Sequence, residues 1–280
     1  MSEKNFVQND GSNNSNDSND ILRQISGQLR LSLGNIYSAL ERIAPPDLRD
    51  ADRATDLNAA LLTQSFMRIM RIADNLEDAA GLGEPNLFQP QNVDIVKFCE
   101  KIAEEASHPA QLLGLELVYT SDADRCNIAI DAGRMERLLL NLLSNAFKFT
   151  PKGGRVTLEV RVEKEKVLLL VADTGCGISD DIAATLFARY LQPGRMEPPP
   201  HGLGLGLRIC RQVAEEHGGS ILALGNEDGG ATLVVSLPRR RVTEGKMRTP
   251  LTPPRGNFNR ILVELSDALP KEAFTQKYMD

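Results

Sequence analysis

Three short motifs hold the residues of this sequence whose types and spacing could bind a ligand. In the first, NLLSNAFKF at 141–149, Asn141, Asn145 and Lys148 recur at intervals that place them on one face of a helix. An amide oxygen is a hard ligand that suits Mg²⁺, and a lysine supplies positive charge to nearby phosphate groups. The motif therefore predicts a helix face that binds phosphates and a metal ion.

The second motif, DTGCGI at 173–178, directly follows an apolar run and so begins at the end of an expected strand. A buried carboxylate at Asp173 could accept a hydrogen bond from an adenine amino group. Gly175 and Gly177 would let the backbone pass close to a flat ring. The second motif therefore predicts the base-binding side of a nucleotide site.

The third motif, GLGLGL at 202–207, places three glycines next to the start of an amphipathic helix. Backbone N–H groups at a helix start, together with the helix dipole, favour a bound phosphate. The motif does not follow a strand as it would in a βαβ dinucleotide-binding unit, which argues against a Rossmann-type site. The glycines of this expected phosphate turn are Gly202, Gly204 and Gly206.

Alternating helix and strand patterns between residues 84 and 238 would position these motifs. Helical spacing of apolar residues predicts helices at Val93–Ala106, Ala132–Phe149 and Leu205–His217. Shorter apolar runs predict strands at Leu115–Thr120, Asn127–Ile130, Val156–Val162, Val167–Ala172, Ile221–Gly225 and Thr232–Leu237. The sum is an α+β domain, a two-layer α/β sandwich in which helices cover one face of a mixed sheet.

Residues 21–83 predict a helical hairpin ahead of this domain. Two apolar stripes are separated by Pro45, Pro46 and a polar run, and Gly81 and Gly83 end the second stripe. Because such a hairpin leaves apolar surface exposed, we expect two hairpins to pair as a four-helix bundle in a homodimer. The alternative is packing on the downstream domain alone. The first stripe consists of Leu22, Ile25, Leu29, Leu33, Ile36, Leu40 and Ile43.

The two ends of the chain differ in composition. Residues 1–20 are rich in Asn, Ser, Asp and Gly, so we expect them to be disordered. Residues 239–280 begin as a basic, Pro-containing linker and end in an apolar segment at 261–274. We expect that segment to dock either on its own chain or on a partner.

Overall composition excludes several classes of protein. A net charge of −6 argues against a general nucleic-acid partner. No apolar run approaches the ~20 residues that span a bilayer, and the start is not a basic-then-apolar leader, so we expect a cytoplasmic protein without membrane insertion. The four cysteines lack metal-ligand spacing and are expected to be reduced thiols.

The order and spacing of the three motifs, followed by HGG at 217–219, resemble the catalytic ATP-binding domain of sensor histidine kinases. That domain has the Bergerat-type fold of the superfamily that also holds gyrase, the Hsp90 chaperones and the MutL-type repair proteins. The resemblance covers about residues 90–238 and implies ATP and Mg²⁺ as cofactors. It implies that Asn145 holds Mg²⁺ and that Asn141 and Lys148 flank the phosphates.

The resemblance also implies roles for the remaining motif residues. Asp173 would contact adenine, Gly175 and Gly177 would shape its pocket, and Thr232 would lie near the base. The three glycines of the third motif would belong to the hinge of an ATP lid and to phosphate contacts.

The hairpin departs from the family pattern at the phosphoacceptor site. The family carries His-Glu-Leu-Arg-Thr-Pro-Leu in its first helix, and the like-placed run here is GQLRLSL at 27–33. Gly27 has no side chain to phosphorylate, Gln28 cannot act as a base, and Leu31 replaces the threonine of family phosphatase chemistry. We therefore expect an ATP-binding, histidine-kinase-like protein of a two-component system or phosphorelay that does not phosphorylate its own hairpin. Its expected partner is a response regulator or a partner histidine kinase.

Three other interpretations stay open. A working kinase would need its acceptor at His108, His201 or His217, none of which lies on the hairpin. A non-enzymatic adaptor would keep the fold, bind little nucleotide, and dock a response regulator or partner kinase. A serine kinase acting on an anti-anti-sigma partner belongs to a branch that usually lacks a long hairpin.

Overall fold

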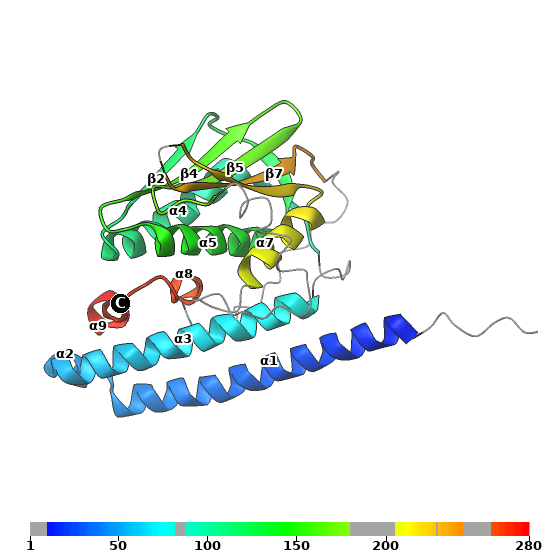
Figure 1. Ribbon diagram of the computed structural model, residues 1–280. Coiled ribbons are helices and arrows are strands. Elements are labelled where there is room, and N and C mark those ends of the chain that lie inside the picture. Colours follow the sequence, from blue (N-terminus) through cyan, green and yellow to red (C-terminus); the bar gives the residue numbers. More distant parts are fainter. Residues whose placement is uncertain (1–9, 82–87, 180–204, 228, 243–258, 280) are drawn as a thin grey trace, which may run out of the picture.

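The computed structural model describes residues 10–81, 88–179, 205–227, 229–242 and 259–279. Within these ranges a long helical hairpin lies along one side of an α/β domain, and the C-terminal segment lies between the two (Figure 1). None of the helices in these ranges combines the length and apolar character that crossing a lipid bilayer requires.

The hairpin consists of α1 (Asp10–Ile43) and α3 (Arg53–Gly81), with the short helix α2 (Pro46–Ala51) at the bend. Pro46 occupies the first turn of α2, where its missing N–H costs no intrahelical hydrogen bond. The two long helices agree with the sequence pattern. The bend contains a helical turn that the polar composition of the link did not predict.

Composition predicts disorder for residues 1–20, whereas α1 begins at Asp10 and so includes residues 10–20 of that segment. Residues 1–9 lie outside the described ranges. Once a helix is nucleated, each further residue adds a backbone hydrogen bond, so a packed helix can extend into a polar segment that would not form one alone.

The apolar residues of α1 face two directions. Leu33 and Leu40 are buried and pack with residues of α3 such as Phe66 and Ala59. Other members of the same stripe remain exposed, so packing between α1 and α3 buries only part of the expected stripe. The large apolar side chains exposed on the two long helices are Ile21, Ile25, Leu31, Ile36, Ile43, Leu61, Leu62, Ile69 and Ile72.

Two polar contacts fix how α1 and α3 lie against each other next to Gly27. The buried Ser26 hydroxyl donates a hydrogen bond to the Ala73 carbonyl oxygen at 2.8 Å. One helical turn further on, Arg30 Nε donates to Asp74 Oδ1 at 3.0 Å. The segment that resembles a phosphoacceptor site therefore has a defined position beside α3.

The described part of the α/β domain contains a five-stranded sheet in the order β2-β4-β5-β7-β6. The β2–β4 pair is parallel and the other pairs are antiparallel, so the sheet is mixed as the sequence predicts. The strands are β2 (Glu116–Ser121), β4 (Arg155–Val162), β5 (Lys166–Asp173), β6 (Ser220–Gly225) and β7 (Ala231–Pro238).

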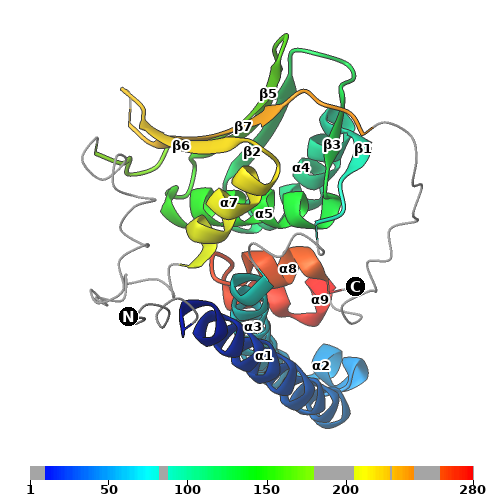
Figure 2. The ribbon, with the colours of Figure 1, turned by 90° about the vertical axis from the view of Figure 1, so that its right-hand side faces the viewer.

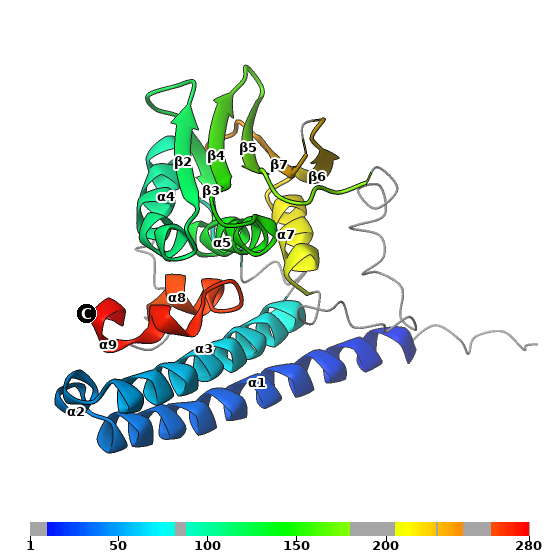
Figure 3. The same ribbon diagram turned by 60° about the vertical axis from the view of Figure 1, so that its left-hand side comes forward.

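Helices cover one face of this sheet (Figure 3), and the predicted two-layer α/β sandwich is confirmed. The helix at Ala132–Phe149 contributes Leu138, Leu139 and Leu142 to the core, and all three are fully buried. The covering helices are α4 (Ile95–Leu112), α5 (Ala132–Phe149) and α7 (Leu205–Glu216).

A small second sheet pairs β1 (Gln91–Asp94) with β3 (Asn127–Ile130) in antiparallel fashion. The helix predicted at Val93–Ala106 therefore begins later, at Ile95, and continues to Leu112. Val93 pairs with Ile128 instead of entering the helix. Such a partner, distant in sequence, leaves no trace in local periodicity, which explains the error.

The C-terminal segment, defined here as residues 259–279, docks on its own chain between α3 and the helices of the α/β domain (Figure 2). It contains α8 (Arg260–Leu265), the 3-10 helix η3 (Lys271–Phe274) and α9 (Gln276–Met279). Leu265 and Phe274 are fully buried. Gln64 of α3 donates to the Leu269 carbonyl oxygen at 2.6 Å, so polar contacts accompany the apolar ones.

Candidate nucleotide-binding site

Helix α5, which carries the first motif, begins at a well-defined cap. Asp131 is the N-cap residue, and its Oδ1 accepts a hydrogen bond from the Arg134 N–H at 3.1 Å. The Asp131 N–H donates in turn to His217 Nε2 at 3.0 Å, and Nδ1 of that ring lies 2.7 Å from the Val213 carbonyl oxygen. The histidine of the HGG run is therefore a buried, hydrogen-bonded structural residue that joins α7 to the start of α5.

The other end of α5 meets the second motif closely. A Cβ on Gly175 would lie 2.3 Å from the Phe149 carbonyl oxygen, which is far inside contact distance. Only glycine lets this turn approach the end of α5, so Gly175 has a packing role beside the expected role toward a flat ring. Gly177 has a φ of +77°, a conformation that glycine adopts without strain.

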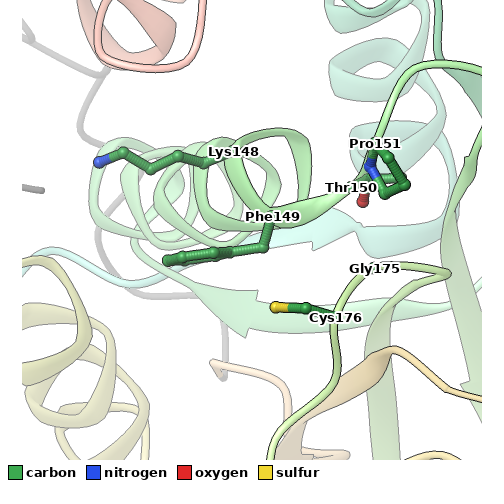
Figure 4. A pocket seen from close by; sticks show the side chains of 6 residues that line it. All are labelled: Lys148, Phe149, Thr150, Pro151, Gly175 and Cys176. Carbon is green, nitrogen blue, oxygen red and sulfur yellow. The ribbon is translucent and has the colours of Figure 1, made fainter.

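A pocket of about 350 Å³ opens between the end of α5 and the second motif (Figure 4). Phe149 and Cys176 face each other across it in the close-up view, and the exposed ring of Phe149 forms one wall. Residues from the first two motifs thus line one opening, as the sequence predicts for a nucleotide site. The lining residues are Lys148, Phe149, Thr150, Pro151, Gly175 and Cys176.

Asp173 lies at the last position of β5 and is held by backbone N–H groups. Its Oδ1 accepts hydrogen bonds from Gly175 N at 2.8 Å and from Ala231 N at 3.3 Å. Oδ2 accepts none from a described residue and stays available to a ligand donor. Burial raises the pKa of the Asp173 carboxyl, and the two N–H groups oppose that shift. The arrangement suits a carboxylate that receives a hydrogen bond from a base amino group.

Thr232 reaches Asp173 indirectly. Its hydroxyl donates to Asn226 Oδ1 at 2.8 Å, and Asn226 Nδ2 lies 3.4 Å from the carbonyl oxygen of Asp173. Gly230 passes so close that a Cβ there would stand 1.9 Å from that same oxygen. Thr232 therefore belongs to the structure around Asp173.

Asn145 has the properties that a metal ligand needs. It lies on the fourth turn of α5, is partly buried, and makes no side-chain hydrogen bond to another described residue. An amide oxygen with no partner among the described residues fits Mg²⁺, which keeps most of its waters and takes few protein ligands. The residue present thus fits the ion that the sequence predicts.

Asn141, in contrast, is fully engaged by the protein. Its Oδ1 accepts a hydrogen bond from Arg71 Nη2 at 2.9 Å, and its Nδ2 donates to the Arg137 carbonyl oxygen at 3.0 Å. The side chain is only 1% exposed. A Cβ on Gly206 would lie 2.9 Å from the same Oδ1, so the start of α7 closes over this residue. In this arrangement Asn141 cannot contact a phosphate.

Lys148 lines the pocket but extends away from Cys176 (Figure 4). Burial lowers the pKa of its ammonium group, while the nearby charge of Asp267 opposes this and those of Arg71 and Arg68 reinforce it. These charged neighbours lie on the C-terminal segment and on α3. The phosphate-binding face predicted for α5 is therefore split: no described residue engages Asn145, Arg71 binds Asn141, and Lys148 lies near charges of α3 and the C-terminal segment.

Of the three glycines in the third motif, the described ranges include Gly206, in the first turn of α7. Gly202 and Gly204 lie outside the described residues, as does His201. The described part of the motif agrees with a helix start that lies near Asn141.

Sequence reasoning missed Arg71, Asn226 and Gly230. The doublet Gly229-Gly230 directly before a strand is a signal that could have been used, because paired glycines often mark φ > 0. Nothing in the local sequence marks Arg71, which is one of several charged residues along a long helix.

Residues 130–241 match the family described as histidine kinase-, DNA gyrase B-, and HSP90-like ATPase. Sensor protein KdpD from Clostridium acetobutylicum is 30% identical over 222 residues, which cover 78% of this chain and 24% of that protein. Sensor protein SrrB from Staphylococcus aureus is 27% identical over 226 residues, which cover 79% of this chain and 38% of that protein. The chain thus spans less than two fifths of either relative.

Two solved structures share the fold across both the hairpin and the α/β domain. Full-length ShkA, in complex with AMPPNP, has a TM-score of 0.62 at 24% identity and covers 81% of this chain and 47% of that one. Histidine kinase ThkA, in complex with response regulator protein TrrA, has a TM-score of 0.52 at 16% identity and covers 79% of this chain and 61% of that one. Residues 130–241 therefore form a domain of the histidine kinase-like ATPase family, and the chain as a whole is similar to sensor histidine kinases.

Proposed function

We propose that this protein binds ATP with Mg²⁺ as a histidine-kinase-like member of a two-component system or phosphorelay and does not phosphorylate its own hairpin. The observation that carries the proposal is that one chain combines two features. The Asp173 carboxylate is available to a ligand, and glycine (Gly27) occupies the acceptor position. Asp173 Oδ2 would receive the adenine amino group, and Asn145 would hold Mg²⁺. The bound metal would neutralise phosphate charge.

Gly27 supplies no atom that could accept a phosphoryl group, and Gln28 supplies no base. The remaining histidines do not replace them. His217 is buried with both ring nitrogens in hydrogen bonds, and the exposed His108 belongs to α4 and not to the hairpin helices. His201 lies outside the described residues. Transfer of phosphate to a partner protein is the activity most consistent with these residues.

Calorimetry with ATP and Mg²⁺ tests the first half of the proposal. The wild type should bind with micromolar affinity, and Asp173→Asn should bind at least tenfold more weakly, because an amide replaces the anionic acceptor. Cys176→Ser is a matched control that changes a pocket residue without removing an acceptor from the base. Equal affinities for wild type and Asp173→Asn would contradict the assigned role of the carboxylate.

Incubation with γ-labelled ATP and Mg²⁺ tests the second half. The chain alone should take up no acid-labile label, whereas a mixture with a histidine-bearing hairpin of a related kinase should show label on that hairpin. Stable label on this chain alone would refute the proposal. Label on neither chain, together with ATP binding, would favour a nucleotide sensor that presents its bundle to a response regulator.

We further propose a homodimer through the hairpin, acting in the cytoplasm with a response regulator or a partner histidine kinase. The proposal is supported by exposed apolar side chains on both long helices, including Ile36 at 59% and Ile43 at 75% exposure. Sedimentation at micromolar concentration should give a dimer for the wild type and a monomer for Ile36→Glu. An unchanged dimer in that variant would locate the interface elsewhere.

A non-enzymatic adaptor is the second candidate, favoured by the engagement of Asn141 with Arg71. An adaptor needs the fold but no nucleotide. Failure of the wild type to bind ATP–Mg²⁺ in the calorimetry above would select it.

A further inference from the structure

A cluster of buried charges joins the hairpin, the α/β domain and the C-terminal segment. Arg71 of α3 and Arg137 of α5 both face Glu264 of α8, with Nε-to-carboxylate distances of 3.5 and 3.4 Å. The Glu264 side chain is only 2% exposed. Buried charges are costly to leave without partners, so these three parts of the chain hold one another in place.

Arg71 connects this cluster directly to the first motif. Its Nη1 lies 3.0 Å from Asp267 Oδ2 and donates to Ser144 Oγ at 3.1 Å. Its Nη2 donates to Asn141 Oδ1 at 2.9 Å. One guanidinium group therefore contacts both the C-terminal segment and a residue expected to flank the phosphates.

The same segment also acts on Lys148. Asp267 provides the favourable charge that opposes the lowered pKa of the partly buried ammonium group. Asp267 is thus an electrostatic neighbour of Lys148, which lines the pocket, as well as an ion-pair partner of Arg71. Asn145, the expected metal ligand, takes no part in these contacts.

We propose that the C-terminal segment is an intramolecular inhibitory element, which acts through Arg71 to withhold Asn141 from a nucleotide. This inference rests on the proposed binding of ATP–Mg²⁺ at the same site. Phosphate contacts by Asn141 require the Arg71 hydrogen bond to break. Because coupling between two equilibria is reciprocal, loosening the segment strengthens nucleotide binding, and nucleotide binding loosens the segment.

Calorimetry with ATP–Mg²⁺ on the 280-residue chain tests this coupling. Asp267→Asn removes one ion pair of Arg71 at a site that is 33% exposed, without opening a cavity. Glu272→Gln makes the same kind of change on the same segment, at an exposed residue outside the cluster. Couplings of this kind change affinity by about 5- to 150-fold. We expect Asp267→Asn to bind about tenfold more tightly than wild type, and Glu272→Gln to bind like wild type.

A second variant guards against a folding defect in the first. Arg71→Lys keeps a positive charge for Glu264 and Asp267 but lacks the planar fork that reaches Ser144 and Asn141 together. It should also bind ATP–Mg²⁺ more tightly than wild type. The double variant should gain less than the product of the two single effects, because both changes weaken one contact.

Hydrogen exchange gives a readout that does not depend on affinity. Saturating ATP–Mg²⁺ should speed amide exchange in α8 and η3 of the wild type, whereas a merely structural segment would be unaffected or protected. Wild-type binding with unchanged or weaker binding in Asp267→Asn and Arg71→Lys would overturn the inference and leave the proposed function intact. No binding by wild type or either variant would overturn both.

Discussion

The doublet Gly229-Gly230 gives the sharpest test of how the base-binding side is built. Both residues have positive φ, +90° and +86°. An alanine at either position would therefore carry left-handed strain of about 1–2 kcal/mol. The two positions differ in the room that they leave for an added Cβ. A Cβ at Gly230 would stand 1.9 Å from the Asp173 carbonyl oxygen, whereas the nearest atom to a Cβ at Gly229 is 3.9 Å away.

The overlap at Gly230 has to be relieved by moving the end of β5, because the obstructing atom belongs to the backbone. Forcing atoms into a packed site costs about 1–3 kcal/mol beyond the strain. Gly230→Ala should therefore lower the free energy of unfolding by about 2–5 kcal/mol, and Gly229→Ala by about 1–2 kcal/mol. The shift should also displace Asp173, so Gly230→Ala should weaken ATP–Mg²⁺ binding more than tenfold.

Urea unfolding measures the first effect and calorimetry the second, with Gly229→Ala as the matched control in both. Equal losses of stability in the two variants would show that the overlap has no consequence. Wild-type nucleotide affinity in a destabilised Gly230→Ala would show that the position of Asp173 does not govern binding.

Three further predictions concern stability and are checked by urea unfolding. Phe274→Ala should cost about 3–5 kcal/mol, because the ring is fully buried between the hairpin and the domain. Gly27→Ala should stabilise by about 0.5–1 kcal/mol, since no atom lies within 4 Å of the added Cβ inside α1. Burial lowers the pKa of His217. The contribution of its neutral imidazole to the free energy of unfolding is therefore present above the unfolded pKa of about 6.5 and is lost as pH falls through the folded pKa. His217→Gln should therefore lose less stability than wild type between about pH 7.5 and about pH 5.5, and an equal loss would contradict this.

Elements that bury one face were predicted well from sequence. The predicted bounds of α5 and of β3 agree with the observed Ala132–Phe149 and Asn127–Ile130. Periodicity suffices here because each side chain's burial follows from its position along its own helix or strand. The same reasoning missed β1, whose pairing with β3 depends on residues far along the chain.

The sequence by itself determined which residues could meet a nucleotide and that the acceptor position is glycine. Residue type and local spacing are enough for both, because a helix face or a strand end is a local property. Only the tertiary structure decided which of those residues are available. Asn141 and Asn145 lie one turn apart, yet Arg71 binds the first, while no residue in the described ranges engages the second. That difference arises from charges on α3 and α8, which folding alone brings to α5.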